Sequence, residues 1–245
     1  MTETVLLTLL IFTAALLYAS VGHGGASGYL AAMALFNQVP EVMKPTALVL
    51  NLLVAGVGTV RYTQAGCFSW NTFWPFAALS IPFAFAGGMW KLPDTTYKAI
   101  LGLVLLFAAW RLAIRQSAHA PPAQRAIFLP AALVLGAAIG LLSGLTGVGG
   151  GIFLSPLLLL LGWADPRKTA GVSAAFILVN SAAGLLGHLE SVKLLPGEIL
   201  WWAPAALVGG IVGAELGSRR LTPLAMRRML AAVLVVAGLK LLLTR

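Results

Sequence analysis

Charged side chains are scarce in this chain. They make up 9% of its 245 residues, whereas 60% of the residues are hydrophobic and the mean hydropathy is +0.95. A soluble domain has about 25% charged residues, so this composition excludes an ordinary soluble protein. We therefore predict an all-α polytopic membrane protein.

Cysteine, histidine and acidic residues are also few. The lone cysteine, Cys67, cannot form an internal disulfide, and His23, His119 and His188 lack the spacing of metal ligands. The seven Asp and Glu residues lie mostly at the ends of hydrophobic stretches, so a multi-carboxylate cation site is not expected. Serine, histidine and acid do not cluster as a nucleophile with its base. We expect neither an enzyme nor a metal or cofactor protein, which leaves anions or neutral solutes as ligands.

Basic residues, in contrast, are in excess. Sixteen Lys and Arg against seven Asp and Glu give a formal net charge of +9, which fits nucleic acid, anionic lipid or an anionic solute as partner. Most of the cations stand at the ends of hydrophobic segments, as Arg219 and Arg220 do, which is typical of topology determinants. We therefore expect a lipid bilayer and a small anion as partners, and no nucleic acid.

Hydrophobic runs divide the chain into two halves of five segments each. We predict a first membrane repeat over 1–115, a cytoplasmic connector over 116–125 and a second membrane repeat over 126–245. The predicted segments are 4–20, 25–37, 45–61, 70–90 and 96–114, followed by 127–143, 150–162, 169–187, 199–217 and 225–243. Because five is odd, the second repeat enters the membrane from the opposite side, which predicts two inverted repeats.

Two glycine clusters occupy matching places in the halves, at 22–27 and 147–151. Each follows a hydrophobic stretch of about one membrane length, and the segments after them, 25–37 and 150–162, are short for a full span. We expect the first two segments of each repeat to form a re-entrant or V-shaped hairpin. A glycine break at membrane depth leaves backbone N–H groups facing a cavity, where they can replace water around a small anion.

The predicted substrate-binding residues are drawn from these clusters and from polar residues near membrane depth. An asparagine amide both donates and accepts, which suits an oxyanion that carries a proton. The alternatives are close helix packing through the glycines and helix–helix hydrogen bonds through the polar side chains. The set is Gly24, Gly25, Ser27, Thr46, Asn51, Thr146, Gly149, Gly150, Gly151, Thr169, Ser173 and Asn180, with Ser155 and Ser181 in the same polar layer. His23 and His188 are candidates for a proton-linked role, with interfacial or solvated histidines as the alternative.

Several motifs resemble those of one family. They are a Gly-x-Gly-Gly break after the first segment, Lys44-Pro-Thr46-Ala47, the stretch Gly-Leu-Thr-Gly-Val-Gly-Gly-Gly at 144–151, Asp165-Pro-Arg-Lys-Thr169-Ala, and Gly213-Ala-Glu-Leu-Gly217. The chain resembles, over nearly its full length, the sulfite exporter TauE/SafE family of bacterial and archaeal inner-membrane permeases. The stretch 144–151 is its most specific part, and His23 departs from the family pattern.

The resemblance implies a permease that moves sulfite, thiosulfate or organosulfonates across the bacterial or archaeal cytoplasmic (inner) membrane without ATP hydrolysis. Together with the repeats it predicts a multi-pass secondary transporter working by alternating access. The alternatives are a passive anion channel, a transporter of small organic carboxylates, and a membrane scaffold whose glycines only pack helices. The transport direction, a coupling proton or ion, and a homodimer are left open.

Overall fold

The chain folds into a bundle of helices. A computed structural model describes residues 2–90, 92–113 and 125–219, together with 235, 238, 239, 242 and 243. The regular elements of these residues are α1 (Thr2–Ala19), α2 (Ala26–Leu35), α3 (Pro40–Gln64), α4 (Trp70–Met89), α5 (Asp94–Ala113), α6 (Leu129–Thr146), α7 (Gly151–Leu160), α8 (Pro166–Gly187), the 3-10 helix η1 (Leu189–Leu194) and α9 (Ile199–Arg219).

Within the described residues, six of these helices are long and apolar enough to cross a membrane. They are α1, α3, α4, α6, α8 and α9, and the shortest of them has 18 residues, which at 1.5 Å per residue spans about 27 Å. The helix α2 has 10 residues and is too short to cross. The prediction of an all-helical, polytopic membrane protein is therefore confirmed.

Nine of the ten predicted segments correspond to helices, with shifts of a few residues at their ends. The largest shift is at α3, which begins at Pro40 and not at residue 45, because a proline fits the first helical position, where its missing N–H costs nothing. Lys44 consequently lies inside α3 and not in a loop. The helix η1 was not predicted. The tenth segment, 225–243, and the connector 116–125 lie almost entirely outside the described residues, so the domain boundaries stay a prediction.

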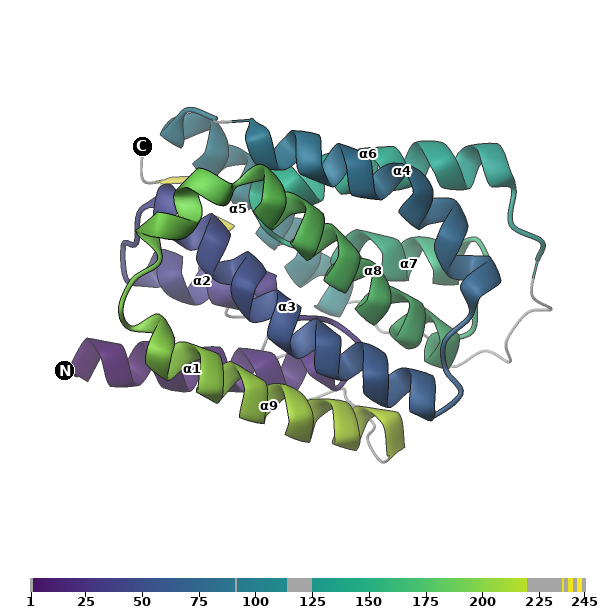
Figure 1. Cartoon of the computed structure of the whole chain (residues 1–245), viewed down its shortest axis with the longest axis horizontal. Helices are drawn as coiled ribbons and strands as arrows, with labels where there is room; N and C mark the ends of the chain where they lie inside the picture. The colour runs from purple at the N-terminus through teal and green to yellow at the C-terminus, as the bar shows by residue number, and fades with distance from the viewer. Residues whose placement is uncertain are drawn as a thin grey trace.

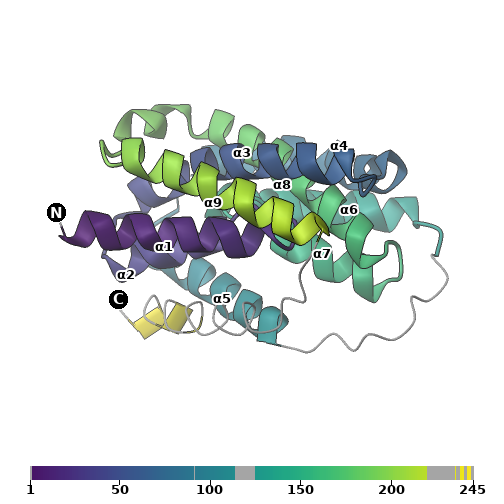
Figure 2. The ribbon, with the colours of Figure 1, turned by 90° about the horizontal axis from the view of Figure 1, so that it is seen from below.

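The helices α3 and α8 form the centre of the bundle (Figure 1). They pack on each other, and 61% of the apolar window of each is buried, against 33% for α1 and for α9 at the periphery. The helix α4 packs on α6 and α8, and α9 packs on α1 and α3. Figure 2 shows α1 and α9 running side by side. Their exposed apolar side chains, such as Val5, Leu9 and Trp201, suit a lipid-facing surface.

Two glycine stripes hold peripheral helix pairs in close contact. On α6, a methyl added at Gly140 would collide with the backbone oxygen of Ser80 on α4, and on α9 one added at Gly213 would collide with that of Leu16 on α1. Both stripes repeat every four residues, which places small residues on one helix face. The complete stripes are Gly136, Gly140 and Gly144 on α6, and Gly209, Gly213 and Gly217 on α9. The Gly213–Gly217 motif of the sequence is therefore a packing motif.

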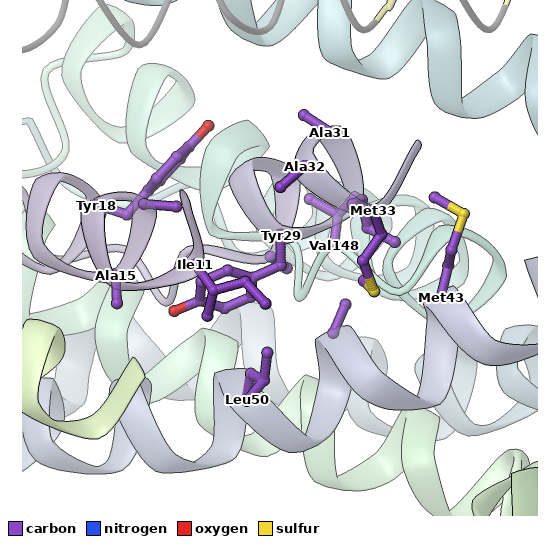
Figure 3. Close-up of a cluster of buried hydrophobic side chains, with 14 of the residues drawn as sticks. Ile11, Ala15, Tyr18, Tyr29, Ala31, Ala32, Met33, Met43, Leu50 and Val148 are labelled. Atoms are coloured by element: carbon purple, nitrogen blue, oxygen red, sulfur yellow. The ribbon is translucent and has the colours of Figure 1, made fainter. Parts of the chain in front are cut away.

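A buried apolar cluster connects the first two helices with the second half of the chain (Figure 3). Tyr18 of α1 and Tyr29 and Met33 of α2 belong to this cluster, together with Leu50 of α3. Val148, from the glycine-rich segment after α6, is part of the same cluster. The apolar core thus fixes the glycine segments of the two halves against each other.

Candidate functional site

The first glycine loop, residues 20–25, connects α1 to α2. Gly22 and Gly25 have φ values of +78° and +99°, a left-handed backbone that side-chain-bearing residues rarely adopt. The N–H of His23 donates to the carbonyl of Tyr18 at 2.9 Å, which closes the turn after α1. The hydroxyl of Tyr29 donates to the carbonyl of Gly24 at 2.8 Å, so α2 ties down the end of the loop from which it begins.

The second glycine loop, residues 147–150, connects α6 to α7. Gly147 caps α6 in the left-handed conformation, and its N–H donates to the carbonyl of Ser143 at 2.8 Å. Gly149 and Gly150 also have positive φ values, +84° and +79°. Three glycines in this conformation turn the chain sharply enough for α7 to begin at Gly151.

Asn51 of α3 joins the two loops. Its Oδ1 accepts a hydrogen bond from the N–H of Ala26, at the first loop, at 3.0 Å. Its Nδ2 lies 3.3 Å from the carbonyl of Val148, in the second loop, and donates to it, and it lies equally far from the hydroxyl of Ser181 on α8. The side chain is 0% exposed. A single amide therefore connects both loops and both central helices.

Backbone donors without a partner gather around this amide. Among the described residues, the five consecutive N–H groups of residues 148–152 make no hydrogen bond, nor do those of Gly24, Gly25 and Ser27. All of these residues are buried. More than about 90% of buried backbone N–H groups in proteins are paired, and each unpaired one costs about 1–3 kcal/mol. Such a concentration of donors, beside two helix N-termini, is what a site for a small acceptor or anion requires.

Only some of the predicted glycines lie where the two loops meet. Gly24, Gly149 and Gly151 lie close to Asn51 or to Ile177 between the loops. Gly150 faces the other way, because a methyl added there would lie 2.9 Å from Ile139 of α6 and 3.0 Å from Phe176 of α8. Its side-chain face therefore belongs to the packing of α6 on α8 and not to the space between the loops.

Some of the predicted polar residues form hydrogen bonds within their own helices, and others have buried polar atoms without a partner among the described residues. Asn180 donates to the carbonyl of Phe176 in its own helix at 2.8 Å, and the hydroxyl of Thr146 donates to Leu142 at 2.6 Å in α6. Among the described residues, the buried Oδ1 of Asn180 and the buried hydroxyls of Thr46 and Thr169 have no hydrogen-bond partner. Asn180 thus does not repeat the bridging role of Asn51.

His23 reaches from the first loop to the second half of the chain. Its Nδ1 donates to the carbonyl of Val21 at 3.1 Å, so in the neutral ring Nε2 is the acceptor. That Nε2 lies 3.1 Å from the hydroxyl of Ser155 on α7, which lies 2.8 Å from the hydroxyl of Ser173 on α8. The hydrogen-bonded chain places Ser173 near the first loop. His188, in contrast, lies at the C-terminal end of α8.

Ile177 and Lys44 were not singled out as site residues from the sequence. Ile177 of α8 is 2% exposed and contacts both glycine loops. Lys44 of α3 is only 6% exposed, and its ammonium group lies 4.3 Å from the centre of the Tyr97 ring. A methyl added at Gly147 would lie 3.3 Å from the Lys44 backbone, so the α3 backbone at this residue packs beside the second loop. The Lys-Pro-Thr motif was the available signal for Lys44.

Comparison with known proteins shows the family of the chain. A family profile described as "Sulfite exporter TauE/SafE" matches residues 7–241. The chain belongs to this family. A probable membrane transporter protein, y4hK, of Sinorhizobium fredii is 43% identical over 98% of this chain and 99% of its own length. A probable membrane transporter protein, MJ0441, of Methanocaldococcus jannaschii is 27% identical over 97% of this chain and 95% of its own length. No solved structure matches the chain.

This TauE/SafE-family chain is therefore a multi-pass membrane protein. The family description and the names of the relatives indicate a membrane transporter and not an enzyme. The glycine stretch at 144–151, which carried the resemblance, forms the end of α6 and the loop with the unpaired donors.

Proposed function

We propose that this chain is a secondary transporter that binds a small anion between its two glycine loops. The observation that carries the proposal is the group of buried, unpaired N–H donors around Asn51. The positive ends of the α2 and α7 dipoles add to their attraction for negative charge. The family description, a sulfite exporter, favours sulfite as a substrate. We extend the proposal to the related anions thiosulfate and organosulfonates, and to a bacterial or archaeal cytoplasmic membrane, which the sequence resemblance implies.

The packing of the helices supports two inverted repeats as the basis of transport. The helix pairs correspond when the halves are exchanged, since α4 packs on α6 as α9 packs on α1, and α2 packs on α3 as α7 packs on α8. The helices α1 and α6 begin at opposite ends of the bundle (Figures 1 and 2). The two glycine loops would then be the tips of two hairpins that enter from opposite sides and meet at Asn51.

The burial of both loops favours a carrier over a passive channel. Asn51 and Ile177 fill the space between the loops, so an anion reaches the N–H groups only when the loops separate. Rocking of one repeat against the other would separate them on one side at a time, which is alternating access. A steady single-channel current without coupling to another ion would favour the channel instead.

His23 supports a proton-linked step in this cycle. Its ring joins the first loop to α7 and α8 through Ser155 and Ser173. Protonation converts Nε2 from an acceptor to a donor, which forces Ser155 to change its role in the chain. A change in charge at this point would alter the contact between the two hairpins.

Anion binding by purified protein tests the proposal. Thermal-shift and calorimetric titrations with sulfite, thiosulfate, sulfate, sulfoacetate and acetate should reveal a ligand, and Gly151→Val should bind it at least about tenfold more weakly. The added side chain would press on the flexible end of Ile177, and no backbone atom is among its nearest neighbours, so the fold should survive while the N–H groups are covered.

Gly197→Val is the matched control, because an added methyl there meets nothing within 4 Å. It should bind the anion as the unaltered protein does. Absence of binding by the unaltered protein, or full binding by Gly151→Val, would contradict the proposal and favour a scaffold whose glycines only pack helices.

A further inference from the structure

We infer that Ile177 limits the size of the anion that the site accepts. The inference rests on the proposed function and adds a determinant of specificity to it. A methyl added at either Gly24 or Gly149 would lie 2.9 Å from the Cγ2 of Ile177, and one added at Gly151 would collide with the Cδ1 of the same side chain. One side chain on α8 therefore lies against a glycine of each loop, Gly24 and Gly149, and against Gly151 at the start of α7.

One polar and one apolar side chain, those of Asn51 and Ile177, lie where the two loops meet. A methyl added at Gly24 or at Gly149 would meet both the amide of Asn51 and the Cγ2 of Ile177. The amide is held by both loops, through Ala26 and Val148. The isoleucine side chain forms no hydrogen bond, so it affects a ligand through the volume it occupies.

Different parts of a bound anion would therefore contact the polar and the apolar side chain. The oxygens of an oxyanion need the N–H groups and the amide, whereas any organic substituent has to fit against the apolar side chain. A compact inorganic anion has no such substituent, but a sulfonate with a carbon chain competes with Ile177 for space. Shortening residue 177 should therefore favour the larger anion, and one methylene in an apolar pocket changes discrimination by about 10- to 200-fold.

Leu48, the residue of the first half that corresponds to Ile177, does not lie between the loops. Ile177 precedes Asn180 by three residues, and Leu48 precedes Asn51 by three. Leu48 is also fully buried, but its methyl groups lie 3.6–3.7 Å from a methyl added at Gly184 of α8, where α3 and α8 pack. Leu48 is thus a core residue of similar size and burial, and it provides a matched control.

The experiment compares Ile177→Ala, Ile177→Val and Leu48→Ala. Dissociation constants for sulfite and sulfoacetate are measured by calorimetry on the purified proteins. In Ile177→Ala the preference for sulfoacetate over sulfite should rise at least about tenfold. Ile177→Val, which lacks only the Cδ1 atom against Gly151, should show a smaller rise in the same direction. Leu48→Ala should leave the ratio unchanged.

An unchanged ratio in both Ile177 variants, with sulfite still bound, would overturn the inference and leave the proposed function intact. The same rise in Leu48→Ala would also overturn it, because general loosening of the core would then be the cause. If Ile177→Ala does not fold, the valine variant decides alone. If the unaltered protein binds neither anion, the proposed function fails together with the inference.

Discussion

The two glycine loops occupy equivalent places but have different hydrogen bonds. In the first loop, Tyr29 holds the carbonyl of Gly24, and Asn51 accepts from Ala26. In the second loop and the first turn of α7, the five consecutive N–H groups of residues 148–152 are unpaired within the described structure. The first loop is fixed by its neighbours, whereas the second carries most of the free donors. The unpaired N–H donors are therefore concentrated in the second half of the chain.

Residue identities explain much of the difference. The positions correspond with an offset of 125, so Val148 stands in place of His23 and Leu154 in place of Tyr29. Leucine has no hydroxyl that could donate a hydrogen bond to the carbonyl of Gly149, and valine cannot form a hydrogen bond with a serine. Both loops thus contain glycines with positive φ, while the side chains beside them differ.

The largest expected effect comes from the two asparagines. Asn51→Leu removes the bridge between the loops and leaves its partners buried and unpaired, so it should lower stability by about 3 kcal/mol and abolish anion binding. Asn180→Leu removes one bond within α8 and an unpaired oxygen, so its cost should stay below about 1 kcal/mol. Thermal unfolding in detergent and calorimetric binding measure both. Equal losses of stability and of anion binding in the two variants would contradict the different roles assigned to the two asparagines.

The sequence allowed a good prediction of the helices and of the two breaks. Runs of apolar residues mark spans strongly, and the glycine clusters interrupt them at the points where α1 and α6 end. The early start of α3 was missed, because Pro45 resembles a helix start although Pro40 already provides one.

The composition of the site could be predicted only in part. Asn51 and Asn180 were both predicted as substrate-binding residues, but the amide of Asn180 donates to its own helix, which depends on rotamers and packing. Ile177 was missed for a related reason. An isoleucine in an apolar span has no distinguishing sequence pattern. Its position between the two loops becomes apparent only from the three-dimensional structure.

A smaller effect is expected from the difference between His23 and Val148. Thiosulfate keeps its charge between pH 5.5 and 7.5, so a change in its affinity over this range reports on the protein. A protonated imidazole near the loops attracts the anion, and we expect about fivefold tighter binding at pH 5.5. His23→Val, which copies the second loop, should remove this dependence.

His188→Gln is the control for that measurement, because His188 lies at the far end of α8. The pH dependence of thiosulfate binding should persist in this variant. If it persists in His23→Val as well, His23 is not the titrating group, and the chain through Ser155 and Ser173 has only a structural role.

The smallest effect on stability is expected for the two tyrosines that donate hydrogen bonds to the loops. Tyr29→Phe removes a 2.8 Å hydrogen bond to Gly24 and makes the first loop resemble the second, at a cost of about 1 kcal/mol. Tyr97→Phe removes a 3.3 Å bond to the carbonyl of Thr146, at the start of the second loop, and should cost less because that bond is longer. Thermal unfolding of both variants gives the comparison. A larger loss in Tyr97→Phe would show that the second loop, and not the first, depends more on its neighbours.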